Sequence, residues 1–223
     1  MTVITAITPS TKREGRFDLM ADGRPLATLS LEAIERLGLT VGMALSEQSK
    51  AAVEHEVQTL RTYDRALNML AFRARASREL RLALLKKGEP ELYVDAALER
   101  LTSLGLLNDA DYARQFARAK MTGPGLSKRR LQSELFRRGV ARDVADAAIG
   151  EVLSDEAVDE DAIIERVASK KLRTLSRLDP DTRRRRLYAF LARRGYEPDD
   201  IRRVLTKLLR DADESSPDDS ASV

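Results

Sequence analysis

Three segments of the chain share one pattern of apolar and polar positions, and each copy is centred on a glycine. A leucine stands eight residues before each glycine, another stands four before it, and two basic residues come directly before it. The copies read LRLALLKKG at 80–88, LQSELFRRG at 131–139 and LYAFLARRG at 187–195. Because residues four apart share one helix face, each copy predicts a short helix with an apolar edge that ends at the glycine.

Apolar positions recur in step on both sides of this helix. The residues after each glycine are apolar at the spacing of a buried helical stripe, and another amphipathic run precedes the leucines. Each copy therefore predicts three short helices, which together can enclose a core that no pair of them could. The downstream stripes are Val94, Ala97, Leu98 and Leu101, then Ala145, Ala148, Ile149 and Val152, then Ile201, Val204, Leu205 and Leu208.

The copies predict an all-α main body of three tandem three-helix repeats. Their boundaries are expected at about 62–105, 106–154 and 156–210. Asn108 predicts the cap of the first helix of the second repeat, because acidic residues follow it. An acidic stretch from Ser154 to Asp161 predicts a linker between the second and third repeats.

Residues 1–60 do not follow the repeat and predict a small α/β appendage. Two strand-like runs flank Asp22-Gly23, a common two-residue turn, and so predict a β-hairpin. Ser30 predicts the cap of a short helix that ends at Gly38. A longer helical pattern starts near Ser46 and continues into the first repeat.

Composition limits the cores and the compartment. Hydrophobic residues make up 43% of the chain but aromatic residues only 4%, so each core is expected to be aliphatic. The chain has no Cys, which excludes disulfides and thiolate metal sites and is typical of a reducing compartment. The N-terminal sequence lacks the order of a signal peptide, and no apolar run approaches the roughly 20 residues that span a bilayer. We expect a cytoplasmic protein.

The formal net charge of +3 understates how basic the chain is. Residues 211–223 contain five acidic side chains and no basic one, and predict a disordered acidic tail. The 39 basic residues of the remaining chain therefore face only 31 acidic ones. A polyanionic partner, nucleic acid or an acidic protein groove, is the natural expectation.

Basic residues gather at both ends of the predicted middle helices. The pairs before the glycines are equally well explained by the helix dipole, which favours cations in a last turn by about 0.3–1 kcal/mol each. The basic residues that follow Ser127 and the 179–182 segment are expected at helix starts. Cations there oppose the helix dipole and repel one another. This local cost predicts compensation by an external anion. The candidate contact residues are Lys128, Arg129, Arg130, Arg137, Arg138, Arg183, Arg184, Arg185, Arg186, Arg193 and Arg194.

The sequence contains no catalytic constellation. With no Cys and with His55 as its single histidine, classical zinc sites and most nucleophile–base pairs are excluded. The Gly123-Pro124-Gly125 segment lacks the Lys-Ser/Thr pair of a phosphate-binding loop and predicts a connector between helices. We expect no enzymatic activity, no metal and no cofactor.

Aromatic residues mostly fall at core spacing. Tyr112 and Phe116 lie four residues apart, and Phe136 and Phe190 lie within repeat helices. A stacking platform for single-stranded bases needs exposed aromatic rings among cations. The sequence candidates for such a platform are Tyr188 and Tyr196, although core packing suits both better.

Three stretches resemble the RecX family of bacterial recombination regulators. They read ALNMLAFRARASRELRLALLKKG, ERLTSLGLLNDADYARQFARAKM and GLSKRRLQSELFRRGV. The resemblance covers about residues 63–210 and is most specific over 104–140. There a Gly-Leu-Leu-Asn-Asp turn, a Tyr-Ala-x-x-Phe-Ala helix and a helix with a basic start follow the family's order. The N-terminal appendage and the acidic tail vary among RecX-like proteins, so function is not carried over to them.

The resemblance implies three tandem three-helix modules in an elongated, curved molecule. It also implies a partner, the RecA recombinase filament, in whose helical groove RecX-like proteins lie and restrain ATP hydrolysis, filament growth and strand exchange. DNA binding is expected to be weak and nonspecific, and the protein to be a monomer. Two alternatives remain open. One is an autonomous DNA-binding protein of helix-turn-helix-like modules, and the other is a helical scaffold for a different acidic protein.

Overall fold

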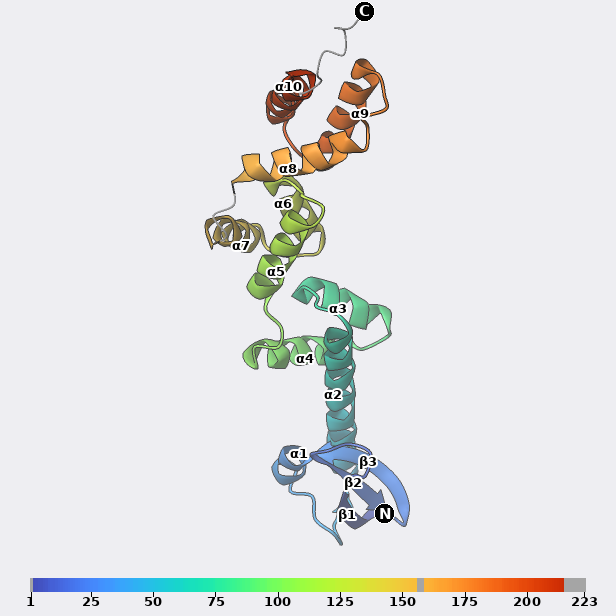
Figure 1. The fold of residues 1–223 in the computed structure, drawn as a ribbon. Coiled ribbons are helices and arrows are strands. Elements are labelled where there is room, and N and C mark those ends of the chain that lie inside the picture. The colour runs from blue at the N-terminus through green and yellow to red at the C-terminus, as the bar shows by residue number, and fades with distance from the viewer. Residues whose placement is uncertain (1, 156–158, 215–223) are drawn as a thin grey trace, which may run out of the picture. The chain divides into compact units, whose positions relative to one another are not determined.

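The chain divides into two compact units. The computed structural model describes residues 2–155 and 159–214. The first unit contains Met1–Arg75 and Glu79–Leu107, and the second contains Ala76–Arg78 and Asn108–Val223. Within the described residues, the first unit contains the strands and the helices α1 to α4, while the second is wholly helical (Figure 1). The predicted helical main body with a small N-terminal strand segment is therefore confirmed.

A four-stranded antiparallel sheet opens the chain, in the order β3-β2-β1-β4. The predicted hairpin between β2 and β3 is confirmed, and its turn residues Asp22 and Gly23 both have positive φ, +48° and +75°. A two-residue turn with positive φ at both positions matches the right-handed twist of paired strands. The strands are β1 (Thr2–Pro9), β2 (Arg16–Ala21), β3 (Arg24–Ser30) and β4 (Ala44–Leu45).

Strand β1 was not predicted, because its apolar residues do not alternate with polar ones. The strand reads TVITAITP, and its pairing with β2 shifts register between Ile4 and Ala6. An extra residue at such a bulge interrupts the two-residue period that marks a strand in sequence. The two-residue β4 is too short to leave any periodic signal.

Two capped helices follow β3, as predicted, one before and one after β4. Helix α1 (Leu31–Arg36) begins after Ser30, whose hydroxyl accepts the Ala33 N–H at 3.2 Å. Helix α2 (Glu47–Phe72) begins after Ser46 and runs without interruption into the first repeat (Figure 1). One helix thus serves two cores: Val53 and Leu60 pack with the sheet, and Ala66 packs with the first repeat.

The first repeat consists of the C-terminal part of α2 with α3 (Ser77–Lys86) and α4 (Glu91–Ser103). Its core contains Leu80, Leu84, Val94 and Leu101, which are the predicted stripe positions, together with Ala66 and Leu107. Each of these side chains is at most 2% exposed. The helical pattern read from the sequence therefore places the right residues inside.

A buried carboxylate ties α2 to the turn between α3 and α4. Glu89 is 4% exposed and follows the glycine that ends α3, where the other two repeats have Val140 and Tyr196. It accepts hydrogen bonds from Thr62 Oγ1 at 2.7 Å and from Gln58 Nε2 at 2.9 Å, and it pairs with Arg65. A buried charge is tolerated when it is hydrogen-bonded and paired in this way.

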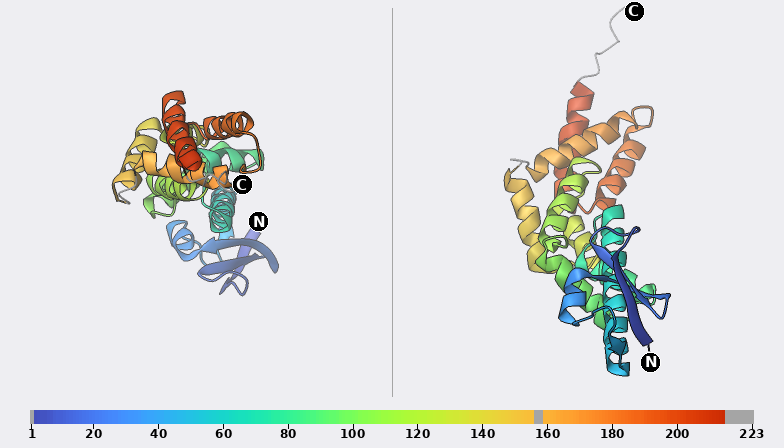
Figure 2. Two further views of the ribbon diagram at one scale, coloured as in Figure 1. Left: turned by 45° about the horizontal axis from the view of Figure 1, so that its top comes forward. Right: turned by 90° about the horizontal axis from the view of Figure 1, so that it is seen from below.

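The second and third repeats share one continuous core. In the second repeat, α5 to α7 pack around Leu131, Leu135 and Ile149; in the third, α8, α9 and α10 pack on one another (Figure 2). The helices are α5 (Asp109–Thr122), α6 (Lys128–Arg137), α7 (Arg142–Asp155), α8 (Glu160–Arg173), α9 (Pro180–Arg193) and α10 (Pro198–Glu214).

Two expectations for the C-terminal half concern segments that lie partly outside the described residues. Helix α10 continues through Glu214, past the residue at which the predicted tail begins, Asp211, and 215–223 lie outside the described residues. The predicted acidic linker also falls partly outside: α7 runs to Asp155, α8 begins at Glu160, and 156–158 are not described. The repeat boundaries chosen from the sequence remain a prediction.

The repeat glycines end α3, α6 and α9 with positive φ, +82° at Gly88, +90° at Gly139 and +88° at Gly195. A Cβ built on Gly195 would lie 2.7 Å from Arg130 Cβ, and one on Gly139 would lie 2.4 Å from Arg78 Cβ. Nothing lies within 4 Å of the same atom at Gly88, in the first repeat, which no repeat precedes. The later glycines therefore also make room for the first turn of the middle helix of the preceding repeat.

Among the described residues, no helix combines the length and apolar character needed to cross a membrane.

Candidate polyanion-binding surface

The basic cluster at 128–130 lies in the first turn of α6, as predicted, whereas Arg184 to Arg186 lie in the second turn of α9, after Asp181 in its first turn. Helix α6 begins after Ser127, whose hydroxyl accepts the Arg130 N–H at 3.2 Å. Helix α9 begins after Asp179, whose carboxylate accepts the Thr182 N–H at 2.8 Å. Both caps satisfy backbone donors that a helix start leaves free.

The C-terminal end of α9 meets the N-terminal end of α6. The Ser127 N–H donates to the Arg194 carbonyl oxygen at 3.1 Å, and Gly195 lies against Arg130. The two helices have lengths of about 21 Å and 15 Å, at 1.5 Å per residue. The structure therefore joins the clusters 128–130 and 193–194, and places 183–186 and 137–138 at the far ends of the two helices.

Arg194 fastens the third repeat to the second. Its Nε donates to the Pro124 carbonyl oxygen at 2.7 Å, and its guanidinium carbon lies 3.7 Å from the centre of the Phe190 ring. Burial lowers the pKa of this guanidinium from its ordinary value. Because its Nε donor and its flat face are used inside the unit, Arg194 has a structural role that the sequence did not reveal.

Other polar side chains donate hydrogen bonds to backbone carbonyls at the end of α5 and in the connector to α6. The Tyr196 hydroxyl donates to the Gly125 carbonyl oxygen at 3.1 Å, and burial raises the pKa of this phenol above its ordinary value. The Arg166 guanidinium donates to the carbonyl oxygens of Thr122 and Met121 at 2.9 Å and 2.8 Å. The glycine-rich connector predicted between helices thus receives side chains from α8 and from the turn that follows α9.

Carboxylates of the chain itself offset the positive charge at the start of α6. Glu160 accepts the Lys128 N–H at 3.0 Å. Arg129 pairs with Glu197 at 2.6 Å, and Arg130 pairs with Glu134 at 3.0 Å. The electrostatic cost that the sequence argument assigned to an external anion is therefore partly met inside the protein at this helix.

The start of α9 differs, because three of its four arginines are exposed and none of these three pairs with a described carboxylate. Arg184, Arg185 and Arg186 are all exposed and form no ion pair with any carboxylate that the structure describes. The pKa of the Asp179 carboxyl is lowered, first by hydrogen bonds from Thr182 and to a smaller extent by the charge of Arg185. Arg183 is half-buried, and its buried Nε has no hydrogen-bond partner among the described residues.

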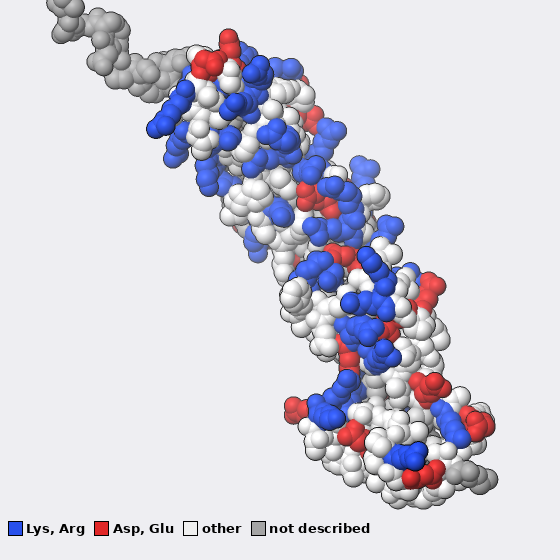
Figure 3. All heavy atoms as spheres, turned by 90° about the vertical axis from the view of Figure 1, so that its right-hand side faces the viewer, with Lys and Arg blue, Asp and Glu red and all other residues white. Residues whose placement is uncertain are grey.

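The remaining candidates lie against neighbouring side chains or in solvent. Arg137 Nε donates to the Ser133 carbonyl oxygen at 3.4 Å, and the Arg138 guanidinium carbon lies 4.8 Å from the centre of the Phe116 ring. Arg193 is exposed at the end of α9. Figure 3 shows that Lys and Arg clearly outnumber Asp and Glu on the drawn face of the second unit.

Sequence reasoning missed a fifth group of cations, at the end of α8 and in the connector that leads to α9. Lys170, Arg173 and Arg177 are exposed there, and Lys171 Nζ lies 5.5 Å from the centre of the Phe190 ring. Cations in a last helical turn are ordinary, so their position carried no signal. Only the position of their helix, packed against α9, adds them to the basic surface.

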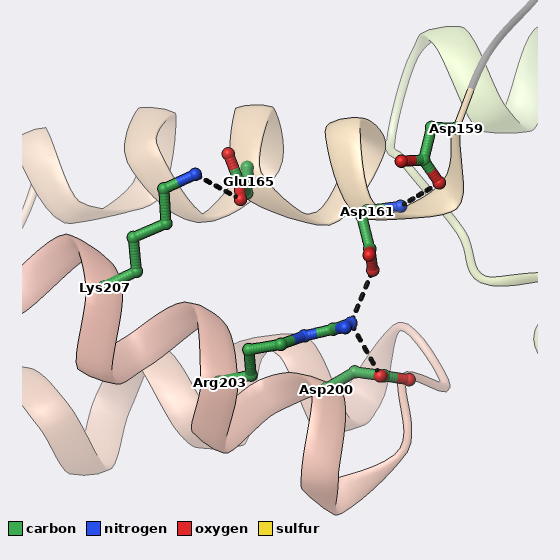
Figure 4. Close-up of polar contacts among 6 residues, drawn as sticks. All are labelled: Asp159, Asp161, Glu165, Asp200, Arg203 and Lys207. Carbon is green, nitrogen blue, oxygen red and sulfur yellow. Dashed lines mark hydrogen bonds and ion pairs between the residues drawn. The ribbon is translucent and has the colours of Figure 1, made fainter.

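Acidic residues of the third repeat form ion pairs with cations of α10, two of them between α8 and α10 (Figure 4). Arg203 pairs with Asp161 at 2.5 Å and with Asp200 at 2.9 Å. Lys207 pairs with Glu165 at 2.7 Å. These pairs neutralise cations of α10, whereas Arg184 to Arg186 form no ion pair with a described carboxylate.

The aromatic side chains differ in part from expectation. Tyr196 is buried, and Tyr188 is 36% exposed. Phe136, expected at a core position, is 65% exposed. His55 is exposed, with its ring 5.2 Å from that of Tyr93, and the described residues contain no cluster of three side chains able to hold a metal ion.

Comparison with known families identifies each repeat separately. The family models of the first, second and third three-helix domains of RecX match residues 63–101, 108–149 and 159–205. Together these matches cover more than half of the chain.

Curated relatives and solved structures agree with this match. The chain is 38% identical to the regulatory protein RecX of Amycolatopsis mediterranei over 65% of its own length and 81% of the relative. It is 32% identical to that of Streptomyces coelicolor over 67% and 78%.

A crystal structure of regulatory protein RecX superposes with a TM-score of 0.73 at 19% identity, covering 95% of this chain and all of the other. That of RecX from Lactobacillus salivarius gives 0.57 at 21% identity, covering 69% and 97%. At these identities the structures support the fold alone. The three matched domains, arranged in family order, and the curated relatives together show that the chain belongs to the RecX family of regulatory proteins.

Proposed function

We propose that this protein binds the RecA–DNA filament and restrains its ATP hydrolysis, growth and strand exchange. The observation that carries the proposal is the row of exposed, unpaired arginines, Arg184 to Arg186, at the start of α9. Three adjacent cations repel one another, and here no described carboxylate pairs with them. A surface of this kind fits an acidic protein groove or a phosphate backbone.

Repeated modules suit a filament because each can contact an equivalent subunit. Contacts that are individually weak then add through effective concentration. A regulator of this type acts by stabilising one filament state or by blocking the next addition, so it needs no catalytic activity of its own. We propose that it does so as a monomer in the cytoplasm, with weak and nonspecific affinity for DNA.

The contact surface is proposed to centre on the exposed members of the candidate set. Arg184 to Arg186, Arg193 and the Lys128 ammonium are free to meet a partner, and Lys170 and Arg173 extend the same surface. Arg194 contributes by holding the two repeats together. Arg129, Arg130, Arg137 and Arg138 already contact neighbouring side chains or carbonyls, so their contribution to binding is expected to be smaller.

The direct test titrates the intact protein into RecA on single-stranded DNA. We expect the DNA-dependent ATPase rate and strand exchange both to fall as the protein approaches stoichiometric amounts, because bound protein restrains the filament. Circular dichroism of the same sample verifies its helical fold. If a folded sample leaves both rates unchanged at stoichiometric amounts, the proposal is contradicted.

A further inference from the structure

A basic hollow of about 570 Å³ lies beside the C-terminal part of α2, in the first unit. A second hollow of about 510 Å³ shares three of its lining residues, Arg61, Arg65 and Lys87. These three cations therefore form the boundary between two concavities on one side of the first unit. Neither the repeat pattern nor the function proposed for the second unit accounts for this surface.

The carboxylates around the hollow are already paired with other cations. Asp64 pairs with Arg13 and also with Arg16, whose Nη2 lies 3.1 Å away. The buried Glu89 pairs with Arg65. Arg61 and Lys87 are left exposed, and no described carboxylate forms an ion pair with either of them. The hollow thus has positive charge available for an external anion.

An exposed aromatic ring lies in the same hollow. Phe72, the last residue of α2, lines it and is 85% exposed, the highest value for any large hydrophobic side chain that the structure describes. Asn68, one turn earlier on α2, is also exposed and lines the hollow. Along α2, Arg61 and Phe72 are separated by roughly 16 Å at 1.5 Å per residue. The hollow therefore combines unpaired cations with an accessible aromatic face.

We propose that this hollow binds a short segment of single-stranded nucleic acid. Arg61 and Lys87 contact the phosphates, and a base stacks on the Phe72 ring. Single-strand binding sites combine these two elements, a positively charged track for the backbone and aromatic rings for the bases. Duplex DNA offers the same phosphates, but its bases are already stacked inside the helix. Phe72 therefore gives the site its preference for single strands.

Fluorescence anisotropy with a short fluorescein-labelled oligo(dT) tests the site on the full chain at low salt, with RecA absent. We expect Phe72→Ala to weaken binding by about tenfold, within the range that stacking one base on an aromatic ring contributes. The same variant is expected to bind a duplex of equal length as the wild type does. The double variant Arg61→Gln/Lys87→Gln is expected to weaken binding of both and to reduce the salt dependence.

Matched controls lie in the same unit. Leu92→Ala removes another exposed apolar side chain, 66% exposed, and Lys12→Gln/Arg24→Gln removes two exposed cations that do not line the hollow. The proposal is overturned if Phe72→Ala binds oligo(dT) as the wild type does or no more weakly than Leu92→Ala, or if it weakens duplex binding equally. Phe72-dependent binding of polyglutamate without binding of oligo(dT) would instead assign the hollow to an acidic protein. Because RecA is absent, neither outcome decides the function proposed for the second unit.

Discussion

Replacing Arg184, Arg185 and Arg186 together by glutamine is expected to weaken binding to the RecA–DNA filament by about tenfold to 100-fold. Each exposed ion pair lost contributes up to about 1 kcal/mol, and 1.4 kcal/mol is a factor of ten in affinity. The three side chains are exposed and form no ion pairs with described carboxylates, so the fold should not depend on them. The protein concentration that halves the RecA ATPase rate measures the effect.

The matched control removes three cations of the same unit that are already paired. Arg142, Arg202 and Arg203 each form an ion pair with a carboxylate on their own helix. Their replacement by glutamine changes the net charge equally, and we expect less than a threefold effect because surface pairs contribute little. Equal losses in the two triple variants would show that net charge alone matters, and would remove α9 from the proposed contact surface.

Gly195→Ala is expected to lower the free energy of unfolding of the second unit by about 2–5 kcal/mol. An alanine at a φ of +88° adopts a left-handed conformation that costs roughly 1–2 kcal/mol. Its Cβ would also lie 2.7 Å from Arg130 Cβ, and overpacking of this kind costs about 1–3 kcal/mol more. Urea unfolding followed by circular dichroism, with a separate transition fitted to each unit, gives the value.

Gly88→Ala separates the two contributions to this cost. Gly88 has a φ of +82° but nothing within 4 Å of its added Cβ, so only the conformational cost of about 1–2 kcal/mol applies to the first unit. We therefore expect the Gly195 variant to lose more stability than the Gly88 variant. Equal losses would mean that the glycines serve only to end helices and that the contact between repeats is not tightly packed.

The repeated helices could be predicted from sequence because each carries its own local signals. Apolar spacing located their buried faces, Asn108 was visible as a cap, and a helix start was visible after Ser127. The same local reasoning fails where periodicity is broken, as at the bulge in β1. Local reasoning explained Gly195 as the end of a helix but not its close approach to Arg130. These two residues lie far apart in the sequence, so no local pattern relates them.

The positions of the candidate cations could be predicted from the sequence, but the ion pairs that they form could not. The basic starts of α6 and α9 follow from sequence, yet the ion pair between Arg129 and Glu197 joins residues 68 positions apart and depends on how the repeats pack. That pairing makes the two basic starts unequal and leaves the greater exposed charge on α9. The exposure of Phe72 was not predicted for a related reason. In sequence, an aromatic residue at the end of an amphipathic helix resembles a core residue, but Phe72 is 85% exposed.

The most direct measurement of the central claim is sedimentation of the protein with preformed RecA filaments on single-stranded DNA. We expect the protein to sediment with the filament at near-stoichiometric amounts and to remain largely in the supernatant with DNA alone at the same salt concentration. Equal sedimentation with bare DNA would support the autonomous DNA-binding alternative. A protein that stays in the supernatant in both cases would contradict the account.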